Sequence, residues 1–520
     1  MKKSLRAASI VCALTLLASV TTACQNNTGS TTDNSSTGAD NTSSTGKVDP
    51  ANAVEVSWWV VGNGQPSNYD EAKKVLDEYS AEKIGVKLDL HCIAWGEWDQ
   101  RRTSMLNSNE QFDIMFENQV DYVKYANYGS FEDITDMVKN ETPDLYAATD
   151  ELLWKGVSVN GKIYGVPSVK DNAQVQMFAF DASLVDKLGL KDAVDNCDSI
   201  QDLEPILSAM KPELEAQGKD PYPLPLNQNE GLPGLIGTLY DGLAMGLPPV
   251  GVSLKDHSTK VVSVFEQEDI KQDLATLHDY YQKGYINSNA NTLTESPTYK
   301  AVMTAQGWEG AEVGWAFNNG VDEYYAKRYR GPFMTSETIQ GSVNCIGSGS
   351  DKKAEALKYL ELINTDSTFR NMLAYGIEGT NWEYVDDEKD TVVKLNDEWG
   401  LASYTQGSYM ILAPQLADAS MKETHPELGK QYSETVANYN EQALSDPSPL
   451  LGFVFDSSNY ATQVANCNNV WMKYRNDLWT GASDPDEILP QMIAELKQNG
   501  MDDLIAAAQE QIDTFLQQNS

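Results

Sequence analysis

The sequence predicts an α/β fold arranged as two or three domains or lobes, and three observations support this. The chain has 520 residues, which is too long for one ordinary hydrophobic core. A predicted strand, helix and strand follow one another at 54–61, 70–83 and 86–92, a spacing typical of an α/β sheet. The short apolar run at 112–116 has the character of a buried parallel strand.

The first elements can be assigned in order from their hydrophobic periodicity. Residues 54–61 (VEVSWWVV) form a strand pattern, and the turn at 63–67 separates them from the helix, whose apolar residues recur at helical spacing. Alternation over 86–92 predicts the second strand. Further strands are expected at 161–167, after a turn, and at 174–180.

The same order of elements returns later in the chain. A strand is expected to end over 344–349, and Ser350 is a candidate N-cap for an apolar-striped helix that follows. Residues 382–393 are expected to form a hairpin with an acidic tip. The last third is predicted to be mainly helical, with Trp471 on an apolar stripe and therefore in the core.

The first 23 residues have the pattern of a bacterial lipoprotein signal peptide. Three basic residues precede an apolar run at 7–20 that is too short for a stable membrane span. The run ends in TTAC, which resembles a lipobox with Cys24 as the lipid-attachment residue, although Thr21 departs from the usual Leu or Val. Residues 24–50 are rich in Ser, Thr, Asn and Gly, which predicts a flexible, lipid-anchored tether. The alternative is ordinary signal cleavage with Cys24 incidental.

The composition excludes several classes of partner. Acidic residues outnumber basic ones by 76 to 38, for a net charge of −38. This weighs against nucleic acid and anionic lipid, which are held through Lys and Arg, and leaves a neutral or cationic ligand possible. Four His make a His-rich metal site unexpected, and no metal ion or cofactor is predicted. Four cysteines follow the tether: Cys92, Cys197, Cys345 and Cys467. They could form disulfides in three possible pairings, and buried free thiols fit the sequence at least as well.

No sequence motif for catalysis is present. The chain lacks a phosphate loop, a GxSxG elbow and an HExxH motif, and residues 62–64 (GNG) lack the third Gly of a dinucleotide fingerprint. Acidic pairs such as Glu309 and Glu312 are expected by chance among 76 carboxylates. The sequence therefore predicts a protein that is not an enzyme.

Several segments, in this order, resemble the extracellular solute-binding proteins of bacterial ABC importers, in the sugar-binding branch (family 1). They are VSWWVVGNG at 56–64, IAWGEWDQRRTSMLNSNEQFDIMF at 93–116, GKIYGVP at 161–167, KAVMTAQGWEGAEVGWAFNNG at 300–320 and GSVNCIGSGSDKKAEALKYLELI at 341–363. The motif YGIEGTNWEYV at 375–385 is similar to one of a subgroup, and the region from 452 onward resembles that subgroup's C-terminal domain of unknown function.

The resemblance implies a two-lobe, periplasmic-binding-protein-like fold with a ligand cleft between the lobes and an interlobe hinge. Lobe 1 is expected to comprise 51–170 and 341–380. Lobe 2 is expected to comprise 171–340 and 381–520, including a helical region at 452–520. Two or three crossings would join them, and 300–320 is expected to be a strand that lines the cleft. Closure around the ligand would present it to a membrane permease.

A neutral sugar requires aromatic platforms and side chains that accept and donate hydrogen bonds. Ligands in open α/β sheets sit at the carboxyl ends of strands. On these two grounds the candidate ligand-binding residues are Trp59, Asn63, Gln65, Glu117, Asn118, Asp171, Asn172, Gln228, Trp308, Trp315, Asn318, Glu378, Asn381 and Trp382. Each also has a packing interpretation: one of Trp58 and Trp59 is expected in the core, and packing of a strand-to-helix turn would explain Trp95 and Trp98 equally well.

The predicted function is that of a monomeric importer lipoprotein that captures an oligosaccharide at the extracellular face of the cell membrane. It would touch the membrane through its lipid only and would bind no nucleic acid. One alternative is a binding protein for a peptide or another small solute. A second is a secreted glycoside hydrolase that uses a carboxylate pair such as Glu309 and Glu378. A third is an adhesin or structural lipoprotein without a deep cleft.

Overall fold

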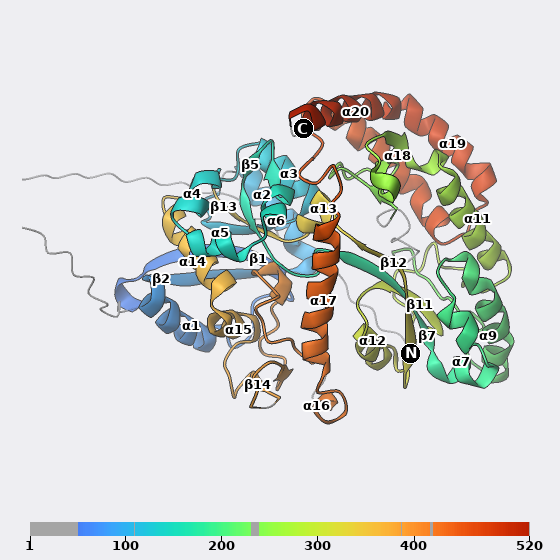
Figure 1. The fold of residues 1–520 in the computed structure, drawn as a ribbon, viewed down its shortest axis with the longest axis horizontal. Coiled ribbons are helices and arrows are strands. Elements are labelled where there is room, and N and C mark those ends of the chain that lie inside the picture. The colour runs from blue at the N-terminus through green and yellow to red at the C-terminus, as the bar shows by residue number, and fades with distance from the viewer. Residues whose placement is uncertain (1–49, 109, 230–238, 386, 417–419, 519–520) are drawn as a thin grey trace, which may run out of the picture. The chain divides into compact units, whose positions relative to one another are not determined.

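A five-stranded sheet forms the centre of the first lobe (Figure 1). The computed structural model describes residues 50–108, 110–229, 239–385, 387–416 and 420–518, so the predicted signal peptide, the tether up to residue 49 and Cys24 lie outside the described residues. The strands are β1 (Val54–Gly62), β2 (Val86–Ala94), β3 (Ile114–Glu117), β6 (Gly165–Pro167) and β13 (Val343–Ile346). Their spatial order is β2-β1-β3-β13-β6.

The strand directions confirm the predicted strand–helix–strand pattern. β1 pairs in parallel with β2 and with β3, while β13 is antiparallel to both β3 and β6. Helix α1 (Tyr69–Ile84) connects β1 to β2, and helix α2 (Trp95–Ser108) follows β2 directly. The carboxyl ends of β1, β2, β3 and β6 therefore lie at one edge of the sheet.

The alternation of side chains along β1 separates its two tryptophans. Trp58 is fully buried, and its Nε1 donates a hydrogen bond to Asn344 Oδ1 at 3.1 Å. Trp59 points to the other face of the strand, where its ring stacks on His91 at 4.1 Å and lies beneath the Arg101 guanidinium at 4.5 Å. The expectation that at least one of the pair belongs to the core is confirmed.

The second lobe contains a three-stranded antiparallel sheet in the order β11-β7-β12. Its strands are β7 (Gln174–Asp181), β11 (Val302–Gln306) and β12 (Tyr324–Phe333). The expectation of one strand over 300–320 is wrong for its second half, where helix α12 (Ala311–Asn319) follows β11. The chain turns between them at residues 307–310, and Gly310 has a φ of 120° that favours glycine.

The remaining elements cover or extend these two sheets. The first lobe adds α3 (Gln119–Asn127), α4 (Thr135–Asn140), α5 (Pro143–Ala148), α6 (Glu151–Gly156), α14 (Lys353–Thr365), α15 (Ser367–Tyr375), β4 (Ser158–Val159) and β5 (Lys162–Ile163). The second lobe adds α7 (Ala182–Leu188), α8 (Lys191–Asp195), α9 (Glu204–Ala216), α11 (Glu268–Gln282), α18 (Ala461–Trp479), α19 (Pro485–Gln498), α20 (Met501–Gln518), β8 (Tyr240–Asp241), β9 (Val250–Ser253) and β10 (Val261–Ser263). Further short elements are α13 (Ser336–Ile339), α16 (Met421–Thr424), β14 (Trp382–Tyr384) and β15 (Val392–Lys394).

Two large hydrophobic clusters correspond to the two lobes, and the chain crosses between them at 168–173 and at 334–342. Helix α17 (Leu428–Ser445) runs between the lobes and provides a third connection (Figure 1). Its Asn440 holds the first crossing, because Oδ1 accepts from the Ala173 N–H at 2.9 Å and Nδ2 donates to the Lys170 carbonyl at 2.7 Å. Trp399, which we expected in lobe 2, packs in the cluster of the first lobe. The lobe boundaries as a whole stay a prediction.

Several local expectations can be compared with the structure. β14 and β15 form the predicted hairpin, the C-terminal region is helical, and Trp471 is buried. Ser350 is not the N-cap of α14, because the helix begins at Lys353 with Lys352 in the capping position. The Ser350 hydroxyl instead donates to Asp113 Oδ1 at 2.6 Å and accepts from the Lys352 N–H at 3.0 Å.

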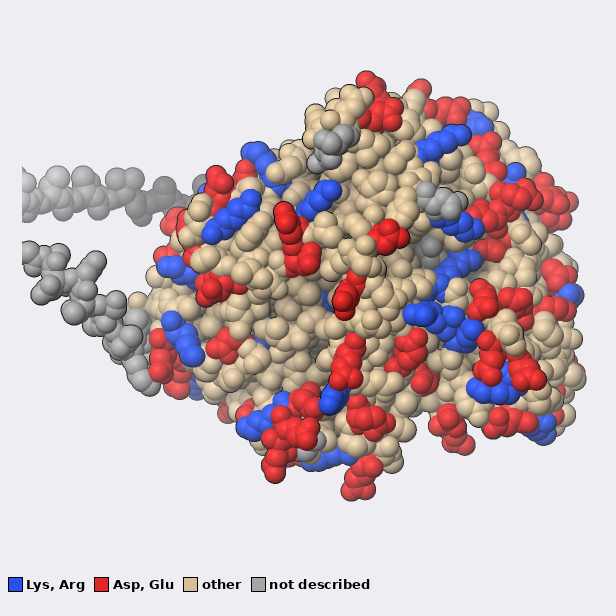
Figure 2. All heavy atoms as spheres, viewed as in Figure 1, with Lys and Arg blue, Asp and Glu red and all other residues tan. Residues whose placement is uncertain are grey.

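The four cysteines of the described chain are buried free thiols, which resolves the alternatives left open by the sequence. Burial raises the pKa of each thiol, so none is activated as a nucleophile. The acidic excess lies at the surface, where Figure 2 shows Asp and Glu side chains spread over the visible face with Lys and Arg between them. Over the described residues, no helix has the length and apolar character needed to cross a membrane.

Candidate ligand-binding site at the interlobe crossing

Four strand ends and the first crossing meet at one edge of the first sheet. Residues that follow these ends are Asn63 after β1, Trp95 after β2, Asn118 after β3 and Ser168 after β6. In an open α/β sheet, this is the edge at which a ligand is expected, because the loops that follow the strands converge there. The crossing leads directly from this edge to the sheet of the second lobe.

Trp95 presents an aromatic surface at this edge. Its side chain is 48% exposed, and its ring stacks on Tyr404 with centroids 6.2 Å apart and planes 22° apart. The loop that carries Tyr404 is fixed from two sides. Ser342 Oγ in the second crossing donates to the Tyr404 carbonyl at 2.7 Å, and Thr405 Oγ1 donates to the Val61 carbonyl at 3.2 Å. The exposed stacked pair is therefore held in place over the end of β1.

A second group of rings joins three distant segments beside the first crossing. Tyr432 of α17 makes edge contacts with Tyr409, at 5.4 Å between centroids, and with Trp308, at 5.3 Å. The backbone N–H of Tyr409 donates to the Val169 carbonyl at 2.8 Å, which ties its loop to the crossing. Burial raises the pKa of both tyrosines, so their phenols stay protonated and can donate hydrogen bonds.

Asp171 lies among these rings and connects the crossing to the second lobe. Its Oδ2 accepts from Gln306 Nε2 at 2.8 Å, and its Oδ1 pairs with Lys170 Nζ at 2.8 Å. Burial, followed by the negative charge of Asp171, raises the pKa of Tyr404 and of Tyr432. We define the crossing cluster as Trp95, Asp171, Trp308, Tyr404, Tyr409 and Tyr432.

The predicted residues fall into three groups with respect to this cluster. Asp171 and Trp308 belong to it. Asn63 is exposed and Asn118 half-buried at the same sheet edge, and the Asn118 side chain makes no capping hydrogen bond to α3. Asn318 and Glu378 are exposed, on α12 and in the turn before β14. Ligand contact by these six residues stays a prediction. The other predicted residues have roles in packing or in the backbone.

Four predicted amides form hydrogen bonds within the fold. Burial contradicts ligand contact for Asn172 and Asn381, and contact by Gln65 and Gln228 stays a prediction. Gln65 bonds the edge of β2, with Nε2 donating to the Leu90 carbonyl at 2.9 Å and Oε1 accepting from the Cys92 N–H at 2.9 Å. Asn172 is fully buried and bonds backbone within the crossing. Asn381 is buried under the hairpin, and Gln228 accepts from Asn476 Nδ2 at 3.2 Å.

Three predicted tryptophans are also occupied by packing. Trp59 is held between His91 and Arg101 within the first lobe. Trp382 is buried, and its Nε1 donates to the Gly376 carbonyl at 2.9 Å. Trp315 lies on α12, under the turn that precedes it, so a Cβ at Gly307 would come within 2.5 Å of its ring. Burial contradicts a platform role for Trp382, whereas Trp59 and Trp315 are half-exposed and their platform role stays a prediction.

Glu117 is the last correction, because its carboxyl is fully buried below the sheet edge. Its Oε2 accepts from Arg102 Nη1 at 3.2 Å, and Arg102 also pairs with Asp121 at 2.7 Å. Its residue type and its strand-end position predicted ligand contact for Glu117. The side chain is instead buried in the lobe, where the Arg102 guanidinium only partly offsets the cost of burying the carboxyl.

Glu117 carries a prediction about pH. Burial raises its pKa to about 8, although Arg102 opposes the rise. In the unfolded chain, Glu117 releases its proton near an ordinary carboxyl pKa of about 4. Between about pH 4 and pH 8 the folded state therefore binds more protons than the unfolded state, and the free energy of unfolding falls as pH rises through this range. We expect Glu117→Gln to remove this part of the decline, as measured by urea denaturation at about pH 5 and pH 8.

The exposed Glu110 offers a matched control for this measurement. Glu110→Gln should keep the decline seen in the wild type, because that carboxylate is exposed and pairs with Arg101. If the free energy of unfolding declines equally in the wild type and in Glu117→Gln, then Glu117 does not keep its proton at neutral pH in the folded protein.

Sequence reasoning missed four of the six members of the crossing cluster. Trp95 had a detectable signal, because it directly follows a strand at the carboxyl edge. Packing of the turn explained Trp95 equally well. Its neighbour Trp98 is buried, whereas Trp95 is half exposed. Tyr404, Tyr409 and Tyr432 had no signal in the sequence, because they lie in a loop and a helix that are far along the chain from the sheet edge.

The described residues contain no group of three or more His, Cys, Asp or Glu side chains placed to hold a metal ion. The chemistry available at the crossing is therefore that of aromatic faces, phenols, amides and one half-exposed carboxylate. Such a set binds a ligand that offers both apolar faces and hydrogen-bond donors.

Comparison with known families agrees with this fold. Residues 74–392 match the family described as bacterial extracellular solute-binding protein, which confirms the family resemblance of the sequence motifs. Residues 449–517 match a domain of unknown function (DUF3502), which confirms the expectation for the C-terminal region.

Known relatives resemble the chain over most of its length. A carbohydrate ABC transporter substrate-binding protein of Streptococcus pneumoniae serotype 4 (strain ATCC BAA-334 / TIGR4) is 28% identical over 481 residues, 90% of this chain and 92% of that protein. The crystal structure of the N-glycan transport solute binding protein (NgtS) from Streptococcus pneumoniae matches with a TM-score of 0.75 at 27% identity, covering 90% of this chain and 100% of that one. Its complex with Man5GlcNAc matches with a TM-score of 0.68 at 26% identity, covering 90% and 99%. By the match over 74–392 and its two-lobe α/β architecture, the chain belongs to the bacterial extracellular solute-binding proteins.

Proposed function

We propose that the chain is the substrate-binding lipoprotein of an ABC importer that captures an extracellular oligosaccharide and delivers it to a membrane permease. Members of its family are binding proteins, and the chain is accordingly not an enzyme. The observation that carries the proposal is the crossing cluster, which places exposed aromatic faces beside the carboxylate of Asp171. The relatives described as carbohydrate-binding and N-glycan-binding proteins support the choice of ligand.

The cluster fits the chemistry of an uncharged glycan. Sugar rings carry apolar C–H faces that pack on Trp and Tyr rings, and hydroxyls that donate to carboxylates and amides. Trp95 and Tyr404 offer the exposed rings, and Asp171 offers a half-exposed acceptor. The protonated phenols of Tyr409 and Tyr432 can donate to sugar oxygens.

The contacts around the first crossing suggest how closure would respond to a ligand. The Asp171–Gln306 hydrogen bond links the crossing to β11, and Gln431 of α17 donates to the Glu309 carbonyl at 2.9 Å. A ligand that touches the cluster would contact groups held by both lobes and by α17. The ligand would stabilise the arrangement in which both lobes and α17 contact it, and moving the lobes into this arrangement is hinge closure.

The cellular setting is part of the proposal. Family membership makes the chain an extracellular protein. We infer that lipid attachment at Cys24 and the tether at 24–50 hold the folded region at the outer face of the cell membrane, as a monomer. The lobes are bounded as predicted above, except that the segment around Trp399 belongs to lobe 1.

Isothermal titration of the purified chain with a panel of ligands tests the proposal. We expect a neutral oligosaccharide in the panel to bind with a dissociation constant in about the micromolar range or tighter, and free peptides and inorganic ions not to bind. Tight binding of a peptide with no response to any glycan would refute the carbohydrate assignment.

The Asp171 carboxylate provides the matched variant for the same titration. Asp171→Asn should weaken binding by about tenfold, because the amide loses charge and the pairing with Lys170. Asp397→Asn, an exposed carboxylate paired with Lys394 beyond the hairpin, should leave the affinity unchanged.

A further inference from the structure

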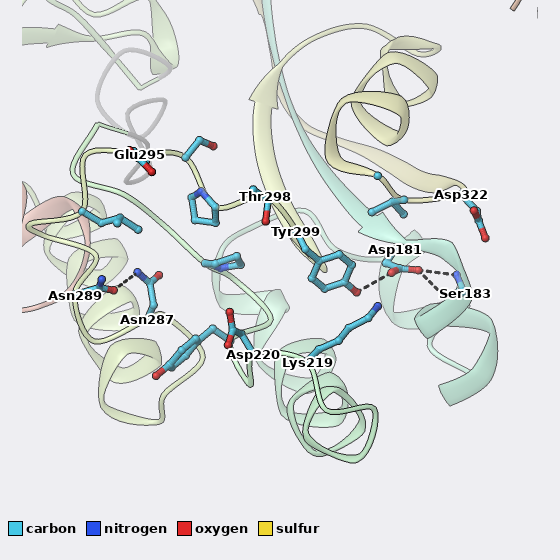
Figure 3. A pocket seen from close by; sticks show the side chains of 17 residues that line it. Asp181, Ser183, Lys219, Asp220, Asn287, Asn289, Glu295, Thr298, Tyr299 and Asp322 are labelled. Atoms are coloured by element: carbon cyan, nitrogen blue, oxygen red, sulfur yellow. Dashed lines mark hydrogen bonds between the residues drawn. The ribbon is translucent and has the colours of Figure 1, made fainter. Parts of the chain in front are cut away.

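A cavity lies in the second lobe, at the end of its sheet that is remote from the first crossing. β7 leaves the crossing at Gln174 and ends at Asp181, and the loops that meet at that end surround a cavity of about 690 Å³ (Figure 3). An eight-residue strand spans roughly 25 Å, so this cavity is separate from the crossing cluster. No residue of that cluster lines it among those the structure describes. Its volume is within the range of small-molecule sites.

The walls of this distal cavity are held by hydrogen bonds among its own residues. The Tyr299 hydroxyl donates to Asp181 Oδ2 at 2.8 Å, and Asp181 Oδ1 accepts from the Ser183 N–H and hydroxyl at 3.0 and 2.6 Å. Across the cavity, Asn287 accepts from the Leu226 N–H at 2.8 Å and donates to Asn289 Oδ1 at 2.8 Å (Figure 3). The polar groups are thus positioned before any ligand arrives, as a binding site requires.

The distal cavity combines aromatic and aliphatic surface with hydrogen-bond acceptors. Tyr222, Leu293 and the Tyr299 ring supply the apolar surface. Asp220 and Glu295 line it with exposed carboxylates that form no ion pair with any described residue. Acceptors beside rings match a ligand that donates several hydrogen bonds and has apolar faces, which is the chemistry of sugar hydroxyls on a sugar ring.

The charge of the distal cavity discriminates against anions. Four of its described lining residues are acidic, and Lys219 is the one basic residue among them. The Lys219 Nζ lies 4.0 Å from the centre of the Tyr299 ring, so its charge is directed at the aromatic face. An anionic ligand would meet net repulsion here, whereas a neutral one would not.

We propose that the distal cavity is a second carbohydrate site, which binds a short uncharged glycan segment and excludes glycans that carry carboxylate or phosphate groups. It lies outside the crossing and does not depend on the importer role. A chain with both sites can hold two sugars at once, or two parts of one branched glycan.

Sugar binding in a chain with a disabled crossing cluster tests the proposal. The probe is neutral mannotriose, followed by saturation-transfer NMR and by titration calorimetry on the double variant Trp95→Ala/Trp308→Ala. We expect this variant to retain weak mannotriose binding, and the added substitution Tyr222→Ala to weaken that binding by about tenfold or more. Tyr128→Ala, an exposed tyrosine of the first lobe, is the matched control and should change nothing.

Three results would overturn the second site. The first is that the double variant binds no mannotriose, and the second is that Tyr222→Ala leaves its residual binding unchanged. The third is that the double variant binds spermidine or Ca²⁺ instead of sugar, and that Asp220→Asn/Glu295→Gln abolishes this cation binding. Equal binding of a trisaccharide that ends in glucuronic acid would refute the exclusion of anions.

The same experiment separates the two sites. If the double variant binds as tightly as the wild type, the crossing cluster is contradicted and the distal cavity is not. The single variant Tyr222→Ala then tests the distal cavity, because it should lower the number of mannotriose molecules bound per chain. An unchanged number would refute the second carbohydrate site.

Discussion

Replacing Trp382 by Ala is expected to lower the free energy of unfolding by about 3–5 kcal/mol and to leave the ligand affinity of the folded protein unchanged. The side chain is buried, its ring packs against Tyr375 and Tyr384 at 6.0 and 4.9 Å between centroids, and its Nε1 donates to the Gly376 carbonyl. Truncation leaves a cavity and an unpaired carbonyl at the base of the hairpin. Urea denaturation and titration calorimetry measure the two quantities.

A conservative change at the same position separates volume from hydrogen bonding. Trp382→Phe retains most of the ring packing and loses only the Nε1 donor, so its loss of stability should be clearly smaller than that of the Ala variant. Weakened glycan binding at unchanged stability in Trp382→Ala would instead restore this residue to the ligand site.

Replacing Trp95 by Ala is expected to have the opposite profile. The affinity for the glycan should fall by about 30- to 100-fold, or about 2–3 kcal/mol, because the exposed ring is the platform at the sheet edge. The free energy of unfolding should change by no more than about 1 kcal/mol, because 48% of the side chain is already exposed and its stacking partner Tyr404 is held by its own backbone contacts. The same two measurements apply.

Two further variants control for the loss of the Trp95 ring. Trp95→Phe keeps an aromatic face and should recover most of the affinity, whereas Tyr128→Ala removes another exposed ring of the first lobe and should have no effect. A large loss of stability in Trp95→Ala with unchanged affinity would assign Trp95 to packing of the turn.

The fold could be predicted because its signals are local. Alternation in β1 and β2, helical spacing in α1 and the apolar run in β3 each depend on neighbouring residues, and the structure confirms all four. The local sequence pattern gave a wrong prediction where a turn separates two elements. Residues 300–320 carry a strand and a helix in succession, and the glycines at 307 and 310 that divide them were interpreted as part of one strand.

The candidate site could be predicted only in part. The rule that ligands lie at strand ends points to the edge of the sheet where the crossing cluster lies, since Asp171, Asn63 and Asn118 are all near it. The rule cannot say which side chain at a strand end faces outward. Buried Glu117 directly precedes the half-buried Asn118, although both follow from the same strand-end rule.

By itself, the sequence determined the order of the elements, the α/β class and the family, because periodicity and motifs are properties of residues close together in the chain. Only the tertiary structure decided which aromatic side chains meet at the crossing and which are buried. Trp95, Asp171, Trp308 and Tyr432 are brought together by the packing of two lobes and α17. The same packing buries Trp382 and Glu117, residue types that the sequence presents as equally suited to a ligand. Burial depends on contacts between segments that are hundreds of residues apart, and those contacts exist only in the folded protein.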